Sequence, residues 1–334
     1  MRNALVSRGI LLTVLSLALF EAAAPGATLG TDGTAFTLNG EKRFLLGASF
    51  YGALGAPDDF VDRDLDHLKR LGFNWIRVWA TWDAFDNDVS AVNRDGTARE
   101  PYLSRLKAIA GKADRRGMIV DVTLARGPLL PDQVAHLRAV ETLTRALAPF
   151  RNVYLDLANE RDVHDARFVD FPEIRALRDG VKAIDPRRLV TASGDVSGEA
   201  LGRYLFEAQV DFVCPHRPRT ASSAQQTAQT TSAVLAEMKR LGRSVPVHYQ
   251  EPFRRGYGAW QPGLEDFLTD LRNARMGGAA GWCFHNGSAR APQSGPRRSF
   301  DMRASEGRLM EQLDGVEREF VNQAAACLRR AQAE

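Results

Sequence analysis

The sequence predicts a single (β/α)8 barrel, or TIM barrel, and three observations lead to this fold class. The chain has 334 residues and 44% of them are hydrophobic, which suffices for one large core. Apolar segments of strand length alternate with amphipathic segments of helical spacing from residue 30 to residue 334. Polar and aromatic residues recur where the apolar segments end, and side chains at that end of the strands form the active sites of barrel proteins.

Eight apolar segments have the length and composition of β-strands. They are residues 44–52, 74–82, 118–125, 152–160, 188–194, 211–217, 245–251 and 280–286. Eight strands that alternate with helices are typical of a closed barrel of parallel strands. An open doubly wound sheet is the alternative fold, but the turn after the first strand lacks the GxGxxG phosphate loop of that class.

Seven segments between the strands have the spacing of amphipathic helices. They are residues 60–71, 102–116, 131–147, 171–184, 230–241, 264–276 and 309–328. Gly72, Gly117 and Gly242 each follow a helix, where glycine suits a left-handed cap. Before the first strand, residues 35–40 end in Asn-Gly and predict a small hairpin that closes the bottom of the barrel.

Residues 1–24 have the pattern of a secretory signal peptide. Arg2 and Arg8 supply positive charge, residues 10–20 form an apolar run, and residues 22–24 are small alanines that suit cleavage. A membrane anchor is the alternative interpretation, but the apolar run is shorter than a bilayer requires, which is about 20 residues. We therefore expect a secreted or periplasmic protein with no membrane span after signal removal, whose barrel domain occupies residues 30–334.

Charge and metal-ligating residue types argue against several classes of function. The formal net charge is +3 and the basic residues are dispersed, which does not suit a nucleic-acid partner. Cys214, Cys283 and Cys327 show no CxxC spacing, and the six histidines form no metal-binding pattern. We therefore expect neither a metal ion nor another cofactor.

Two glutamates stand at the ends of predicted strands that face each other. Glu160 ends the fourth strand in the run Asp-Leu-Ala-Asn-Glu, and Glu251 ends the seventh in Tyr-Gln-Glu-Pro. Strands four and seven lie across the mouth of a barrel from each other. Two facing carboxyl groups are what hydrolysis of a glycosidic bond requires, because one protonates the leaving oxygen while the other attacks the anomeric carbon.

The order of these and other motifs resembles the clan A glycoside hydrolases, and most nearly the cellulase-like family 5. The matching residues are Asp156-Leu157-Ala158-Asn159-Glu160, Asn74-Trp75-Ile76-Arg77, His216, Glu251, Trp282, and the opening Leu38-Asn39-Gly40 with Phe44-Leu45-Leu46-Gly47. The resemblance spans residues 35–320. It implies a carbohydrate substrate and retaining hydrolysis of β-glycosidic bonds in a polysaccharide or oligosaccharide, as in cellulases and mannanases.

The resemblance also implies roles for the two glutamates. Glu160 would be the acid/base, which needs a raised pKa, and burial beside a second carboxylate could provide it. Glu251 would be the nucleophile and must stay ionised. Arg77 is a permanent cation that could keep Glu251 ionised.

Other matching residues are expected to bind the sugar. Asn159 would donate to the 2-hydroxyl, and His216 would orient the nucleophile or a hydroxyl group. Trp282 would stack on a pyranose ring. Further subsites would be lined by Trp79, Trp82 and Trp260.

The sequence departs from the family pattern at three positions. Pro218 stands where a tyrosine usually follows the strand-six histidine, residues 121–124 lack the strand-three histidine, and Pro252 follows the strand-seven glutamate. Tyr249 is a candidate to replace the missing hydroxyl and to contact the substrate. The departures leave open the alternative of a catalytically inactive barrel that only binds carbohydrate.

Overall fold

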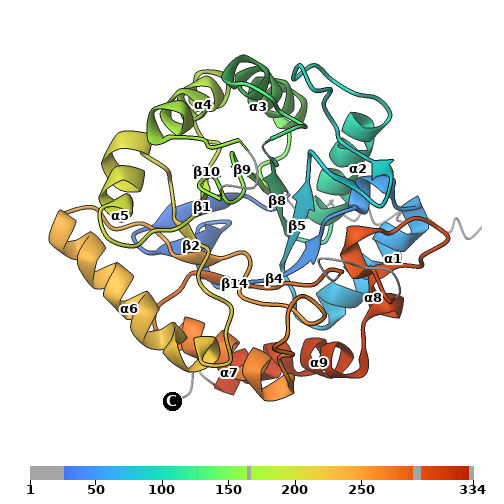
Figure 1. The fold of residues 1–334 in the computed structure, drawn as a ribbon, viewed down its shortest axis with the longest axis vertical. Coiled ribbons are helices and arrows are strands. Elements are labelled where there is room, and N and C mark those ends of the chain that lie inside the picture. Colours follow the sequence, from blue (N-terminus) through green and yellow to red (C-terminus); the bar gives the residue numbers. More distant parts are fainter. Residues whose placement is uncertain (1–25, 126, 164–166, 289–294, 331–334) are drawn as a thin grey trace, which may run out of the picture.

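The computed structural model describes residues 26–125, 127–163, 167–288 and 295–330. Seven parallel strands form one curled sheet, and helices surround it (Figure 1). In order across the sheet, the strands are β10 (Val190–Thr191), β9 (Val153–Asp156), β8 (Ile119–Thr123), β5 (Trp75–Trp79), β4 (Leu45–Phe50), β14 (Gly281–Phe284) and β13 (His248–Tyr249). This arrangement agrees with the predicted α/β barrel.

A short strand lies between the two edges of the curled sheet. β12 (Cys214–Pro215) pairs in parallel with β11 (Ser193–Gly194), which follows β10 in the chain. On its other side, Val213 forms a parallel bridge with Val247, and the amide of His248 donates to the Val213 carbonyl at 2.9 Å. The predicted strands 188–194 and 211–217 are thus shorter and more interrupted than expected. Pro215 contributes to this, since proline has no N–H to continue a ladder.

Seven longer helices in the described part of the chain lie around the sheet (Figure 1). They are α1 (Asp58–Arg70), α2 (Tyr102–Asp114), α3 (Gln133–Leu147), α4 (Phe171–Ile184), α6 (Ser223–Leu241), α7 (Leu264–Met276) and α9 (Gly315–Arg330). In α1 the buried side chains include Val61, Leu65 and Leu68, which recur at helical spacing. The three glycines predicted to adopt the left-handed conformation after helices do so, with φ of 88° at Gly72, 63° at Gly117 and 83° at Gly242.

Three helical regions differ from the prediction. Helix α6 begins at Ser223, ahead of the predicted segment 230–241. Segment 309–328 is divided into α8 (Leu309–Gln312) and α9, because Leu313 is extended. Asp314 and Glu317 then start α9 with a capping box, in which each carboxylate accepts the amide of the other residue at 3.0 and 2.9 Å. Helix α5 (Ala200–Arg203), followed by one π-helical turn at Tyr204–Ala208, is too short to give a periodic signal.

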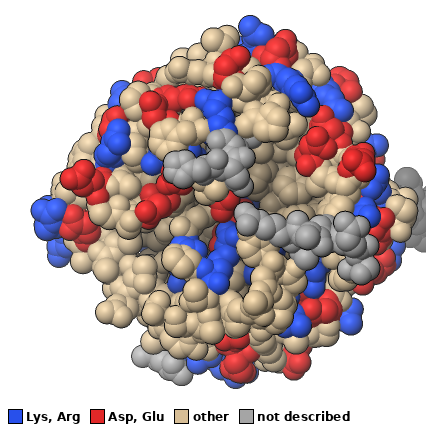
Figure 2. Space-filling model, viewed as in Figure 1, with Lys and Arg blue, Asp and Glu red and all other residues tan. Residues whose placement is uncertain are grey.

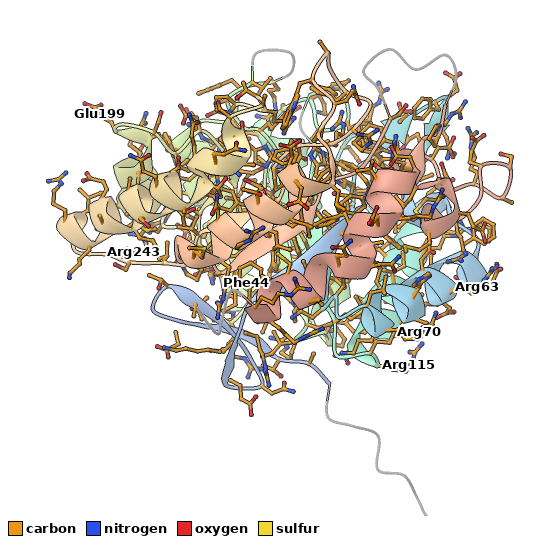
Figure 3. All side chains as sticks on the ribbon, turned by 90° about the horizontal axis from the view of Figure 1, so that it is seen from below. Phe44, Arg63, Arg70, Arg115, Glu199 and Arg243 are labelled. Carbon is orange, nitrogen blue, oxygen red and sulfur yellow. The ribbon has the colours of Figure 1, made fainter. Side chains whose placement is uncertain are left out.

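A small antiparallel sheet closes the bottom of the barrel, as predicted (Figure 3). It consists of β1 (Leu29–Asp32), β2 (Ala35–Leu38) and β3 (Glu41–Arg43). Asn39 and Gly40 form the turn between β2 and β3 with φ of 51° and 85°, values that these two residue types tolerate well. Phe36 is fully buried, and its ring lies 5.0 Å from that of Phe212 inside the barrel.

Loops rather than a sheet border the opposite end, where the parallel strands end. The loop after β5 contains the hairpin β6 (Asp83–Ala84) and β7 (Asn87–Asp88), and 3-10 turns occur at Ala53–Gly55 and Arg298–Phe300. We call this end the mouth of the barrel. It carries both glutamates named from the sequence.

The predicted signal peptide, residues 1–24, lies outside the described residues. Among the residues that are described, no helix is both long enough and apolar enough to cross a bilayer.

Candidate active site

Glu160 and Glu251 meet at the mouth, although 91 positions separate them in the chain. Glu160 follows β9 and Glu251 follows β13. One ligand atom each from Glu160, Glu251 and His216 can be chosen so that all three lie within 4.8 Å of one another. The side chain of Glu251 is only 5% exposed, whereas that of Glu160 is 27% exposed and faces the opening. The two carboxyl groups therefore have different access to solvent.

The backbone of Glu160 is held in an uncommon conformation. Its φ is 46°, in the left-handed region that non-glycine residues rarely adopt. Ser193 supports this turn, because its hydroxyl accepts the Glu160 amide at 3.2 Å and donates to Asp156 at 3.0 Å. Strained residues that their surroundings hold in place cluster at functional sites, so the conformation points to a role for this side chain.

Glu251 is surrounded by hydrogen-bond donors. Arg77 Nη1 donates to it at 2.5 Å, Arg219 Nη2 at 2.9 Å, and the Tyr51 hydroxyl at 3.1 Å. Burial acts to raise the pKa of this carboxyl, but the neighbouring charges, with His285 and Arg77 first, outweigh it and hold the pKa well below its usual value. Burial in turn keeps the pKa of His285 well below its usual value, so the arginines supply the permanent positive charge.

Arg77 is fixed from below by buried acidic residues. It is fully buried, and its guanidinium lies 3.2 Å from Asp121 and 3.0 Å from Asp156. It also donates to the side-chain oxygen of Asn159 at 2.8 Å. Burial raises the pKa of Asp121 to about 7, and Gln250 donates to this carboxyl at 2.7 Å. Arg77 is thus both a structural ion pair of the barrel interior and a contact of Glu251.

The pKa of Glu160 departs from the expectation. Burial acts to raise it, but the hydrogen bond from His216 at 3.2 Å and the charge of Arg219 at 3.3 Å outweigh burial, so the pKa of Glu160 lies below its usual value. The sequence predicts a raised pKa for Glu160 because it indicates that a second carboxylate lies nearby. It does not indicate that Arg219 lies beside Glu160.

Three residues at the site are not predicted from the sequence. Tyr51 directly follows β4 and contacts both Glu251 and His285, the latter at 2.7 Å. His285 follows β14, and Arg219 follows β12. The signal that could have found Tyr51 and His285 is their position directly after apolar strands, whose carboxyl ends converge at the mouth. Arg219 lies further along a loop, where position alone indicates nothing.

The structure contradicts the predicted placement of Trp282 and Tyr249 in the substrate site. Trp282 is fully buried against the helix layer, where its Nε1 donates to Asp270 of α7 at 2.7 Å. The Tyr249 hydroxyl contacts that of Thr231 on α6 at 2.7 Å. The physical reason is the alternation of side chains along a strand, which turns Trp282 outward and His285, three positions later, inward.

An aromatic cluster lies beside Glu251 instead. Trp82 is partly exposed, its Nε1 donates to the Phe300 carbonyl at 2.9 Å, and its ring centroid lies 4.8 Å from that of Tyr51. Trp79 stacks on Tyr51 with centroids 5.0 Å apart. Of the aromatic residues proposed from the sequence, Trp79 and Trp82 thus lie in this cluster, and Trp82 is the more exposed of the two.

A cavity of about 680 Å³, a size typical of ligand pockets, opens beside Glu160. Figure 2 looks onto the mouth and shows a hollow near its centre, where acidic and basic side chains meet. Residues that line the cavity include Glu160, Asp162, His216, Arg219 and Tyr257. Most of these side chains are charged or polar, so the cavity suits a polar ligand.

The spacing of Glu160, His216 and Glu251 could in principle suit a metal ion. Arg219 contacts both carboxylates, and Arg77 contacts Glu251. Two guanidinium groups already neutralise these acids, and their charge would oppose a cation at the same place. The residues fit acid–base chemistry on a bound substrate better than metal coordination.

No family model and no curated protein matches this chain. Solved structures do match: a glycoside hydrolase family 5 structure from Bacteroides vulgatus has a TM-score of 0.61 at 15% identity, over 78% of this chain and 62% of that one. The fold is shared with glycoside hydrolases. This chain thus spans less than two thirds of the length of that structure.

Endo-1,4-β-mannanases are also among the similar structures. The Rhizomucor miehei protein has a TM-score of 0.59 at 15% identity, over 90% of this chain and 99% of that one. The Thermotoga petrophila protein has a TM-score of 0.57 at 14% identity, over 87% of this chain and 100% of that one. The resemblance indicated by the motifs is therefore confirmed at the level of the fold.

Proposed function

We propose that this protein is a retaining glycoside hydrolase that cleaves β-glycosidic bonds, with Glu251 as nucleophile and Glu160 as acid/base. The observation that carries the proposal is the approach of the two carboxylates across the mouth, with ligand atoms within 4.8 Å. Retaining enzymes hold the two groups about 5–5.5 Å apart, whereas inverting enzymes need about 6.5–9.5 Å to admit a water molecule.

The surroundings of Glu251 suit a nucleophile. A nucleophilic carboxylate must be ionised, and its lowered pKa keeps it so at neutral pH. Arg77 and Tyr51 donate to the same oxygen, Oε1. These two contacts orient the carboxylate through Oε1. The other oxygen, Oε2, accepts from Arg219 and is free to attack once that contact is broken.

Glu160 suits the acid/base because it is the more exposed of the two and borders the cavity. In the first step it gives its proton to the leaving oxygen as Glu251 forms a bond to the anomeric carbon. In the second step it takes a proton from the water that attacks the glycosyl-enzyme, which releases the sugar and restores both residues.

The substrate is proposed to be a β-linked polysaccharide or oligosaccharide. The open mouth and the partly exposed Trp82 suit a chain of sugars, and similar structures include proteins named as endo-1,4-β-mannanases. Secretion or export to the periplasm, as expected from residues 1–24, would bring the protein to such substrates.

The configuration of the first product tests the proposal. The wild-type protein would be incubated with aryl β-mannosides, aryl β-glucosides and β-1,4-linked oligosaccharides, and the anomer first released would be followed by proton NMR. We expect the β-anomer from any substrate that is cleaved. Release of the α-anomer would exclude a retaining mechanism, and no cleavage of a broad panel would favour a barrel that only binds carbohydrate.

A further inference from the structure

Three arginines lie at the mouth near its two glutamates. Arg77 contacts Glu251 and is also paired with two buried aspartates below it. Two further arginines, Arg219 and Arg254, reach the same space from the loops after β12 and β13. Unlike Arg77, neither Arg219 nor Arg254 forms an ion pair with an aspartate of the described residues, so these two cations are the ones available to a ligand.

Arg254 is a half-buried cation that no acidic side chain of the described residues contacts directly, although the charge of Glu251 acts on it from a greater distance. Its Nη1 lies 3.0 Å from His285 Nε2, and its guanidinium carbon lies 4.1 Å from the ring centroid of Tyr257 and 5.0 Å from that of Phe300. Within the described part of the chain it forms no ion pair, and its buried Nε has no hydrogen-bond partner. A charge taken from water without a counter-charge is unfavourable unless a ligand supplies one.

Arg219 occupies the position that a sugar must take during catalysis. Its Nη2 lies 3.3 Å from Glu160 and 2.9 Å from Glu251, which places the guanidinium between the proposed acid/base and nucleophile. The anomeric carbon has to lie between the same two groups. Arg219 must therefore move when a substrate binds, and its buried Nε has no partner in the described residues that would resist this.

A neutral sugar offers Arg219 no replacement for two carboxylate contacts, whereas an anionic sugar does. Arg219 and Arg254 lie against one ring, that of Tyr257, at 5.9 and 4.1 Å from its centroid. An anion beside this ring could accept hydrogen bonds from both guanidinium groups, and the planar fork of arginine suits carboxylate and sulfate oxygens.

We infer that the substrate carries an anionic group, a carboxylate or a sulfate ester, which binds between Arg219 and Arg254 against Tyr257. This inference rests on the proposal that the mouth binds a β-glycan. Binding of the anion draws Arg219 away from both glutamates and opens the space for the anomeric carbon. It also removes from Glu160 one of the charges that lower its pKa, which favours the protonated form that a general acid needs.

The test measures binding to matched probes by calorimetry in the Glu160→Gln variant, in which hydrolysis is slowed. The probes are mannohexaose and cellohexaose, their C6-oxidised uronate counterparts, and their 6-O-sulfated counterparts. We expect one anionic series to bind at least about tenfold more tightly than the neutral series, which is about 1.4 kcal/mol. The preference should weaken between 20 mM and 500 mM NaCl, since salt screens charge pairing.

Variants of Arg254 in the same background locate the anion. Arg254→Gln should abolish the preference, and Arg254→Lys, which keeps the charge, should retain part of it. Arg240→Gln is the matched control, because Arg240 is exposed on α6 and pairs with Glu237. Thermal melting shows whether each variant is folded. If Arg254→Gln is not folded, the reduced preference of Arg254→Lys tests the inference in its place.

A tighter uronate series assigns a carboxylate, and a tighter sulfated series assigns a sulfate ester. Equal binding of the neutral and anionic series, or no binding of either anionic series, overturns the inference. The proposed hydrolysis would survive that result if wild-type protein cleaves a neutral glycoside with retention. Conversely, Arg254-dependent binding without any cleavage by the wild type would keep the inference and overturn the proposed hydrolysis.

Discussion

At the scale of single residues, the proposed chemistry depends on which donors contact which glutamate oxygen. Glu251 receives Arg77 and Tyr51 on one oxygen and Arg219 on the other. Within the described part of the chain, Glu160 receives His216 and Arg219 on its Oε1. The two carboxyls are therefore not equivalent, and mutations at each should have different consequences.

Replacement of Glu160 should be rescued by an added nucleophile. Glu160→Ala removes the proton donor, so hydrolysis of a poor leaving group should fall by about 10²–10⁴-fold. A dinitrophenyl glycoside needs no protonation and should still form the glycosyl-enzyme. Azide should then release a β-glycosyl azide, identified by NMR. Full activity of Glu160→Ala, with no effect of azide, would move the acid/base to another residue.

The pH profile tests the low pKa of Glu160. A general acid must be protonated, so kcat/KM for a poor leaving group should fall as the pH rises through this lowered pKa. Arg219→Gln removes one lowering charge, and the basic limb should therefore move to higher pH. Arg240→Gln should leave the limb in place. An unchanged limb in Arg219→Gln would show that Arg219 does not set this pKa.

Two tyrosines on opposite sides of the barrel wall form a matched pair. Tyr51→Phe removes a donor to Glu251, and we expect kcat/KM to fall by at least about tenfold, or about 1.4 kcal/mol of transition-state stabilisation. Tyr249→Phe removes only the contact with Thr231, so activity should remain while the free energy of unfolding falls by about 1 kcal/mol. Steady-state kinetics and urea unfolding check both, and loss of activity in Tyr249→Phe alone would reverse the assignment.

At the scale of elements, apolar strand segments located most of the site but not the direction of every side chain. Runs that end at Glu160 and Glu251 were recognisable because carboxylates follow buried residues. The side of the sheet to which Trp282 points was not recognisable, because β14 is buried on both sides and lacks the polar alternation that would distinguish its two faces. The family resemblance therefore suggested a role that the strand geometry does not allow.

Trp282 should behave as a core residue. Trp282→Ala removes a fully buried ring that packs 5.4 Å from that of Phe320, and we expect a loss of about 3–5 kcal/mol in the free energy of unfolding. The KM of the remaining folded protein should not change. Denaturant unfolding and kinetics below the unfolding transition separate these effects. A large rise in KM with unchanged stability would restore Trp282 to the substrate site.

At the scale of the whole molecule, the barrel joins residues that are distant in sequence. Tyr51 and Glu251, which share a hydrogen bond, are 200 positions apart. No local spacing can show such a contact, because it results from the pairing of β14 with β4, which brings the last parallel strands of the chain beside the first. For the same reason the sequence predicts the architecture, the two glutamates and the tryptophans Trp79 and Trp82, but neither Arg219 nor the contact of Tyr51 with Glu251.

A mutation at the bottom of the barrel should lower stability without changing activity. Phe36 in the bottom sheet is fully buried, and Phe36→Ala should lower the free energy of unfolding by about 3–5 kcal/mol. The mouth lies at the other end, so kcat/KM should be unchanged at temperatures where the variant is folded. Calorimetry with parallel kinetics tests this, and a selective loss of kcat with normal stability would show that the bottom sheet influences the mouth.

The most direct test of the central claim is to trap the proposed covalent intermediate. A dinitrophenyl 2-deoxy-2-fluoro-β-glycoside of the sugar that the protein cleaves fastest should glycosylate the enzyme and then hydrolyse slowly, because the fluorine destabilises the oxocarbenium-like transition states. Peptide mass spectrometry of the inactivated protein should find one fluoroglycosyl group, on Glu251. A label on any other residue, or turnover with inversion and no label, would contradict the account.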